Sequence, residues 1–227
     1  MTTKNLYLQK REEQREKCLK LIDEGVIIWN VEDTYIDKEV VVAPGVEILP
    51  GCILRGSTRI EENVILGPRT MLTNCTVKKG ASVMETVGQD SEIGERASVG
   101  PFTYIRPGTT IGTGCRIGDF VELKNANIGD GTKVSHLTYV GDADVGKGIN
   151  FGCGTVTVNY DGKYKYRTVI EDGAFIGCNT NLIAPVHVGE GAYIAAGSTI
   201  TDDIPEETLA IARARQVIKE NWKDKRK

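Results

Sequence analysis

Aliphatic residues recur at every sixth position over most of this chain. Three uninterrupted series carry the pattern, and they begin at Val42, Val87 and Ile170. The members are Val42, Ile48, Leu54, Ile60, Leu66 and Leu72; Val87, Ile93, Val99, Ile105, Ile111, Ile117 and Leu123; and Ile170, Ile176, Leu182, Val188, Ile194 and Ile200. Neither a helix, with apolar residues every three to four positions, nor an alternating strand has a period of six.

A period of six fits a triangular coil in which each flat face points one aliphatic side chain inward. Three hexads then close one coil of about 18 residues, and equivalent positions stack about 4.8 Å apart on successive coils. Burying each inward residue contributes about 1.5–3 kcal/mol. We therefore predict an all-β domain, a parallel β-helix over residues 35–205, with roughly nine coils.

Two segments flank the predicted β-helix. Residues 1–34 form an N-terminal arm, in which residues 4–24 are rich in helix formers and Gly25 marks a helix end. Residues 206–227 form a C-terminal tail, for which we predict a second short helix or ordered segment over 206–221.

The repeat slips out of phase between Leu123 and Ile170. Its longest interruption, residues 157–168, contains polar, aromatic and basic residues and predicts a loop that projects from the coil. Long loops of this kind are usually functional.

Composition narrows the functional classes. A net charge of −3 gives no indication of a nucleic-acid partner. No apolar run is long enough to span a membrane, and the polar N-terminus lacks the apolar core of a secretory signal, so we expect a cytoplasmic protein. The cysteines show no C-x-x-C pairing and are expected to be reduced, small apolar residues; they are Cys18, Cys52, Cys75, Cys115, Cys153 and Cys178.

Four motifs cluster near the phase breaks: R-P-G at 106–108, V-E-x-K at 121–124, H-L-T-Y-x-G-D at 136–142 and N-Y-D-G at 159–162. In this order they resemble the acetyltransferase half of the bifunctional bacterial enzyme that acetylates glucosamine 1-phosphate and then uridylylates it. The resemblance runs from about residue 93 to Trp222, and more loosely back to about residue 17. It implies a left-handed β-helix, a sense that the spacing alone does not prove.

The resemblance also assigns roles in catalysis. An amine loses a proton as it attacks a thioester, which requires a base with a pKa near neutral. His136, one of two histidines, is implied to be this general base. Glu122 is the candidate for orienting or charge-stabilising His136, with a solvated surface carboxylate as the alternative. His187 is expected to be structural or exposed.

The remaining implied site residues divide by ligand. The phosphate-binding positions are Arg106, Lys124 and Lys165, and the sugar-contacting positions are Tyr139, Asn150, Asn159 and Tyr160. The positions implied to line the groove for acetyl-CoA, the cosubstrate, are Cys153, Cys178, Ala196 and Arg213. The resemblance implies no metal requirement for acetyl transfer.

By resemblance the chain forms a homotrimer with active sites between subunits. The sequence contains no nucleotide-binding first half, so we do not expect uridylyl transfer. Two alternatives remain: a hexapeptide acyltransferase for another amino sugar or nucleotide sugar, and a non-catalytic trimeric β-helix scaffold. A metal-dependent hydratase of the carbonic anhydrase type would require several metal-binding histidines, whereas this chain has two, in unrelated contexts.

Overall fold

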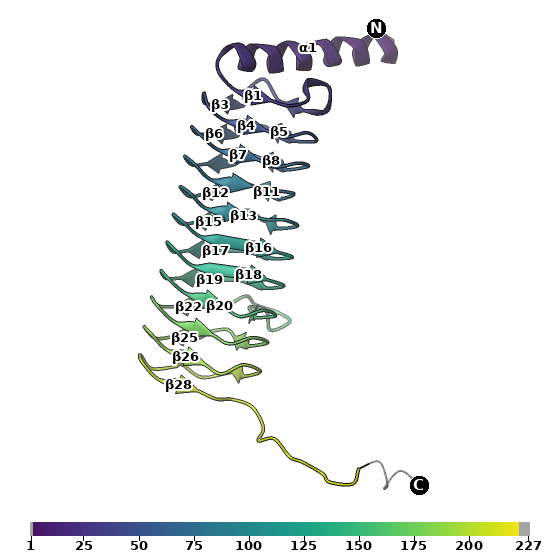
Figure 1. The fold of residues 1–227 in the computed structure, drawn as a ribbon. Helices are drawn as coiled ribbons and strands as arrows, with labels where there is room; N and C mark the ends of the chain where they lie inside the picture. Colours follow the sequence, from purple (N-terminus) through teal and green to yellow (C-terminus); the bar gives the residue numbers. More distant parts are fainter. Residues whose placement is uncertain (1, 223–227) are drawn as a thin grey trace.

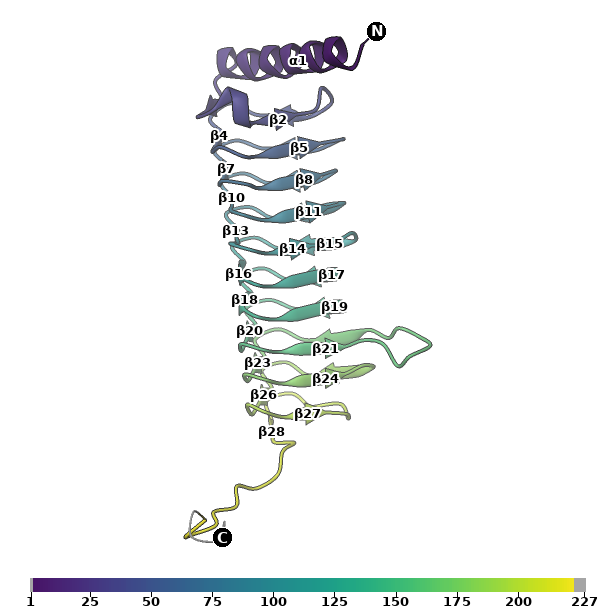
Figure 2. The ribbon, with the colours of Figure 1, turned by 90° about the vertical axis from the view of Figure 1, so that its right-hand side faces the viewer.

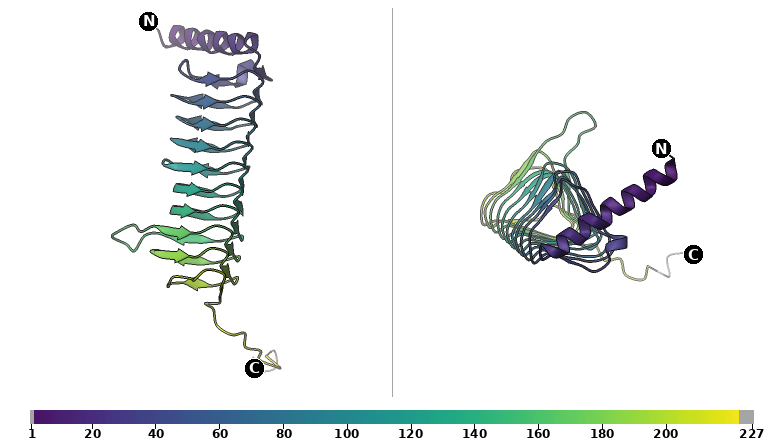
Figure 3. Two further views of the ribbon diagram at one scale, coloured as in Figure 1. Left: turned by 90° about the vertical axis from the view of Figure 1, so that its left-hand side faces the viewer. Right: turned by 90° about the horizontal axis from the view of Figure 1, so that it is seen from above.

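The computed structural model describes residues 2–222, which form a left-handed parallel β-helix with one helix at its N-terminal end (Figure 1). Seen along its axis, the coil is triangular (Figure 3). Strands on successive coils pair in parallel and in register, as the period of six predicts.

The first face of the triangle, face A, is a sheet of 11 strands. Its strands are β1 (Ile27–Ile28), β4 (Glu47–Ile48), β7 (Ile65–Leu66), β10 (Ser82–Val83), β13 (Ser98–Val99), β16 (Arg116–Asp119), β18 (Lys133–His136), β20 (Asn150–Phe151), β23 (Phe175–Ile176), β26 (Tyr193–Ile194) and β28 (Leu209–Ala210).

The other two faces share a sheet of 17 strands. Face B contains β2 (Tyr35–Ile36), β5 (Ile53–Arg55), β8 (Met71–Thr73), β11 (Val87–Gln89), β14 (Tyr104–Ile105), β17 (Glu122–Ile128), β19 (Tyr139–Val145), β21 (Val156–Val158), β24 (Asn181–Ile183) and β27 (Thr199–Ile200). Face C contains β3 (Val41–Val42), β6 (Arg59–Ile60), β9 (Thr76–Val77), β12 (Ser91–Ile93), β15 (Thr109–Ile111), β22 (Thr168–Ile170) and β25 (Val186–Val188), and β17 and β19 run on into it.

The aliphatic series fills the core with one exception. Its other members are buried, from Val42 to Ile200. Val87 instead faces outward and is 38% exposed, and Gly88 takes the inward position. The space there is already filled, because a Cβ on Gly88 would lie 2.8 Å from Leu72 Cδ2 and 3.3 Å from Cys75 Sγ.

The cysteines divide between core and surface. The four thiols at Cys18, Cys52, Cys75 and Cys115 are buried, as predicted for small apolar residues. Burial raises the pKa of Cys18 and of Cys52 to about 11, which keeps both thiols protonated. Of the remaining two, Cys153 is half-buried and Cys178 is exposed.

Helix α1 (Thr3–Asp23) confirms the predicted N-terminal helix and lies across the end of the coil (Figures 2 and 3). Its buried residues Cys18 and Leu21 close the apolar core. Gln14 takes the place of a preceding strand: its amide donates to Ile36 O (3.1 Å) and its carbonyl accepts from Ile36 N (2.8 Å). The helix therefore protects backbone groups at the exposed edge of the first coil.

The stack extends past residues 35–205 at both ends. Before residue 35, β1 already pairs with β4. A 3-10 turn, η1 (Val31–Asp33), connects β1 to β2. After residue 205, β28 pairs with β26. The structure describes no helix between 206 and 222, so of the two forms predicted for this tail the helix is wrong over this range.

A short isolated helix is marginal in water, whereas Leu209–Ala210 gains strand pairing on the last coil. Beyond it the chain leaves the stack in an extended course (Figure 1). The rest of the predicted tail, residues 223–227, lies outside the described residues. Within residues 2–222, no helix is long and apolar enough to cross a membrane.

The inward positions predict a sharp contrast in stability. Leu123 is fully buried, so Leu123→Ala should lower the free energy of unfolding by about 2–5 kcal/mol. Val87→Ala, in the same hexad series but facing outward, should cost under about 1 kcal/mol. Urea unfolding followed by circular dichroism at one protein concentration measures both. Equal losses would contradict the inward and outward assignments.

Candidate active site

The loop that interrupts the repeat projects from one corner of the stack, between β21 and β22 (Figure 2). Arg167 holds its C-terminal end against the coil. The guanidinium donates to both oxygens of Asp144, at 2.7 Å and 2.6 Å, and to the carbonyl oxygens of Asn125 (3.3 Å) and Ala143 (3.1 Å). This anchoring fixes where the loop's other side chains reach the stack.

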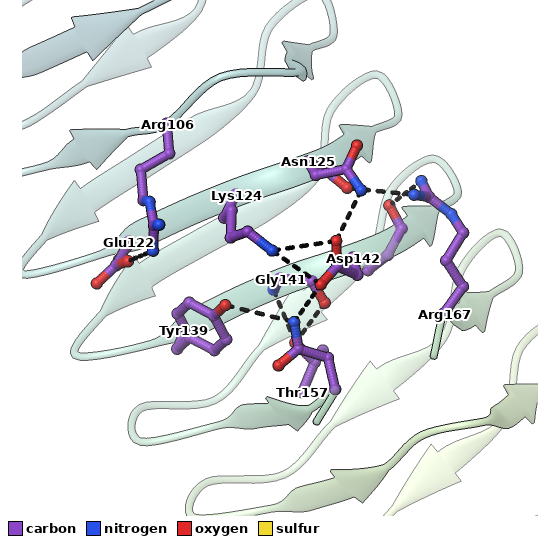
Figure 4. Close-up of polar contacts among 11 residues, drawn as sticks. Arg106, Glu122, Lys124, Asn125, Tyr139, Gly141, Asp142, Thr157 and Arg167 are labelled. Carbon is purple, nitrogen blue, oxygen red and sulfur yellow. Dashed lines mark hydrogen bonds and ion pairs between the residues drawn. The ribbon is translucent and has the colours of Figure 1, made fainter. Parts of the chain in front are cut away.

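Three cations converge where this loop meets face B, two from the face and one, Lys165, from the loop. Arg106 Nη1 donates to Glu122 Oε1 at 2.8 Å, and Lys124 Nζ lies 3.0 Å from Asp142 Oδ2 (Figure 4). Contact with the Lys124 ammonium lowers the pKa of Lys165, and the charge of Arg106 acts in the same direction. The structure thus brings together the three positions that the sequence assigned to phosphate binding.

Asp142 organises this cluster from a nearly buried position. It accepts hydrogen bonds from Asn125 Nδ2 (2.7 Å) and from Lys124 (Figure 4), and a third from Asn159. Burial raises the pKa of Asp142, but these three hydrogen bonds together outweigh it and leave the pKa below its ordinary value. Burial likewise lowers the pKa of Lys124, but its contact with Asp142 contributes to a net rise.

The positions assigned to the sugar are only partly brought together. Asn159 Nδ2 donates to Tyr139 Oη at 3.4 Å, so these two residues border the cations. The exposed Tyr160 is turned to its own loop, where its hydroxyl donates to Gly162 O at 2.7 Å. Asn150 lies on β20 of face A and is therefore on a different face from Tyr139.

His136 ends strand β18 of face A, and its partner differs from the one we expected. Its Nδ1 lies 2.7 Å from Asp119 Oδ1, on the preceding rung. Glu122 instead contacts Arg106. Within one chain the carboxylate that contacts His136 is therefore that of Asp119 and not that of Glu122. The hydrogen bond with His136 lowers the pKa of Asp119 below its ordinary value. His187 contacts Glu171 (2.9 Å), on face C.

The positions assigned to acetyl-CoA continue the column that contains His136. On face A, four residues of successive coils are paired in register: Val134, Phe151, Ile176 and Ile194. The residue two positions after each of them therefore belongs to one outer column, which consists of His136, Cys153, Cys178 and Ala196. Arg213 follows β28, in the segment beside Gly197. Backbone bonds such as Thr199 N to Ala212 O (3.1 Å) hold that segment on the last coil.

An apolar ridge separates this column from the cation cluster. Phe102, Phe120 and Leu137 stand at the corner between faces A and B on three successive coils, all exposed. The two phenyl rings stack with centroids 5.4 Å apart. All three residues have positive φ (57°, 55° and 46°), which is uncommon for bulky side chains.

Metal binding has no visible basis in the described part of the chain. Residues 2–222 contain no group of three or more His, Cys, Asp or Glu side chains arranged to hold a metal ion.

Comparison with known proteins agrees with this geometry. The bacterial transferase hexapeptide pattern (six repeats) matches residues 90–125 and 167–202. Bifunctional protein GlmU of a Geobacillus species is 53% identical over 208 residues, 92% of this chain. That of Brevibacillus brevis is 54% identical over 201 residues, 88% of this chain.

The chain is a hexapeptide-repeat relative of the C-terminal part of GlmU. It spans 45% of the Geobacillus protein and 44% of the Brevibacillus protein, less than half of either. The solved structure of an Arabidopsis UDP-N-acetylglucosamine acyltransferase matches 83% of this chain and 70% of the Arabidopsis chain, with 19% identity and a TM-score of 0.49. This similarity is too distant to bear on function.

Three contributors to the site of this GlmU relative escaped the sequence reasoning: Asp119, Asp142 and Arg167. Asp119 and Asp142 each lie one coil, 17 or 18 residues, from the side chain that they contact, His136 and Lys124 respectively. A search for polar pairs separated by one coil length finds both. Arg167 has no comparable signal, because its contact with Asp144 spans the projecting loop.

The contacts of Asp142 predict a pH-dependent contribution to stability. Its pKa is lower in the fold than in the unfolded chain, so its ionised form stabilises the protein above about pH 4 and this is lost as pH falls through the folded-state pKa. Asp142→Asn should cost about 1.5–3 kcal/mol at pH 7. The difference from the unmodified protein should shrink below about pH 4.

Urea titrations at pH 7 and at pH 3.5 measure this effect. Glu95→Gln, at an exposed carboxylate paired with Arg96, is the control and should cost under about 1 kcal/mol. A loss for Asp142→Asn that is equally large at both pH values would exclude the electrostatic explanation.

Proposed function

We propose that this chain transfers the acetyl group of acetyl-CoA to the amino group of glucosamine 1-phosphate. The observation that carries the proposal is the convergence of Arg106, Lys124 and Lys165 beside Tyr139 and Asn159. Guanidinium and ammonium groups suit a phosphate, and the neutral amide and phenol suit sugar hydroxyls. The relation to GlmU supports the choice of an amino sugar phosphate as acceptor.

The proposed reaction requires one base and one anion-stabilising group. The acceptor nitrogen attacks the thioester carbonyl, and His136 removes the proton that the nitrogen loses. The carbonyl oxygen becomes negative, and we assign its stabilisation to a backbone N–H near Cys153. The carbon–sulfur bond then breaks, and the proton held by His136 neutralises the departing thiolate.

We also propose that the complete site forms between subunits of a homotrimer. Within one chain, His136 and Asn150 lie on face A, whereas the cations lie on face B across the ridge of Phe102, Phe120 and Leu137. A closed threefold arrangement brings face A of one subunit to face B of the next. Such packing also covers the exposed ridge.

Removing the base should abolish most of the activity. His136→Ala should lower kcat by roughly 10²–10⁴, measured as thiol release from acetyl-CoA with glucosamine 1-phosphate. His187→Ala is the matched control, because His187 contacts Glu171 on face C and should leave kcat unchanged. An unchanged rate for His136→Ala would remove this residue from the mechanism.

The cations predict a preference for a phosphorylated acceptor. Glucosamine 1-phosphate should be acetylated, and free glucosamine should react poorly. Arg106→Ala should raise the KM for the sugar phosphate by roughly tenfold or more, the worth of one charge-assisted hydrogen bond. Arg96→Ala, at an exposed arginine paired with Glu95, is the control. Mass spectrometry of an acceptor panel identifies the product, and turnover of a different amino sugar alone would overturn the choice of substrate.

Mixed trimers test whether the site is shared. His136→Ala and Lys124→Ala variants, each inactive alone, should regain part of the activity after they are unfolded and refolded together. Restoration requires that one site take His136 from one chain and Lys124 from its neighbour. If mixing restores nothing while trimers form, both residues act from the same chain.

A further inference from the structure

The two histidines of this chain contact carboxylates through opposite ring nitrogens. His136 offers Nδ1 to Asp119 at 2.7 Å, whereas His187 offers Nε2 to Glu171 at 2.9 Å. The nitrogen that meets the carboxylate decides which nitrogen remains free for a substrate. The difference between the two side chains therefore bears on chemistry.

The charge state of Asp119 fixes the direction of its hydrogen bond. Its lowered pKa keeps the carboxyl group ionised at neutral pH, and an ionised carboxylate can only accept. Nδ1 of His136 must then be the donor. In the neutral imidazole the other nitrogen, Nε2, carries the lone pair.

Strand pairing holds the two side chains together. Asp119 ends β16 and His136 ends β18, and the two are paired residues on neighbouring rungs of face A. Asp119 O also accepts from Leu137 N at 3.0 Å, which fixes the backbone next to His136. Glu122, three residues after Asp119 in the sequence, accepts a hydrogen bond from Arg106 instead.

We propose that Asp119 is a positioning residue that holds His136 in the Nδ1–H tautomer and leaves Nε2 to take the proton of the acceptor amine. The inference rests on the proposed acetyl transfer for its kinetic consequences. Its structural consequence, the tautomer of His136, is independent of any activity.

Nitrogen NMR of protein labelled with ¹⁵N-histidine tests the tautomer directly. With only two histidines the spectrum is simple, and His187→Gln assigns it. Above the imidazole pKa, His136 should show a protonated Nδ1 and an unprotonated Nε2, and His187 the reverse. Asp119→Asn should shift the signals of His136 toward a mixture of tautomers and leave those of His187 unchanged.

The kinetic test separates positioning from binding. Asp119→Asn and Asp119→Ala should lower kcat by about tenfold or more, because the imidazole loses the group that orients it, with little change in KM. Glu122→Gln makes the same change of carboxylate to amide at the partner of Arg106. It should raise the KM for the sugar phosphate instead.

Gel filtration confirms that each variant assembles as the unmodified protein does. Unchanged tautomer signals in Asp119→Asn would overturn the proposal, whether or not kcat falls. If the unmodified protein shows no acetyl transfer, the proposed function fails, and the NMR result still decides whether Asp119 sets the tautomer.

Discussion

The backbone hydrogen bonds between coils are the constraint on which this molecule depends. They hold successive coils about 4.8 Å apart and in register, so that equivalent residues form straight columns of side chains. An inward column is shielded from water along its whole length, so it holds apolar side chains or small hydroxyl side chains whose hydrogen bonds are made inside the coil, such as Thr58 and Thr70. An outward column can hold any residue, and neighbouring members necessarily lie within reach of one another. The contact of Asp119 with His136 and that of Lys124 with Asp142 both follow from this geometry.

The period of six predicted the architecture from sequence alone, and every member of its three series except Val87 is buried, because the core selects for apolar side chains at these positions. It was wrong at Val87, where the spacing between paired rungs shortens: Leu66 pairs with Val83 and Val83 with Val99. A fixed spacing of six residues cannot account for a shortened coil, so it assigned the inward position to Val87 and not to Gly88, the next residue. The C-terminal helix was wrong for a different reason, since local composition does not reveal that Leu209–Ala210 pairs with the last coil.

Sequence reasoning selected the site residues by resemblance but did not predict their partners. Asp119 and Glu122 are three residues apart, and both precede His136 by about one coil. The corner at Phe120 places them on different faces, Asp119 beside His136 and Glu122 beside Arg106. The corner geometry depends on positive φ values, which are not predictable from these residues. Glycine would be expected at such positions, whereas Phe120 and Leu137 are bulky. The choice between the two carboxylates therefore required the structure.

The cation cluster shows how the fold holds like charges together. Arg106 and Lys124 are each offset by a carboxylate, Glu122 and Asp142, whereas Lys165 is brought in by the anchored loop and contacts another cation. The lowered pKa of Lys165 means that its protonated form is disfavoured in this position. A bound phosphate would favour the protonated form, so anion binding and protonation of Lys165 reinforce each other. For the proposed acceptor, an anion would relieve the repulsion between Lys124 and Lys165, whereas a neutral sugar would not.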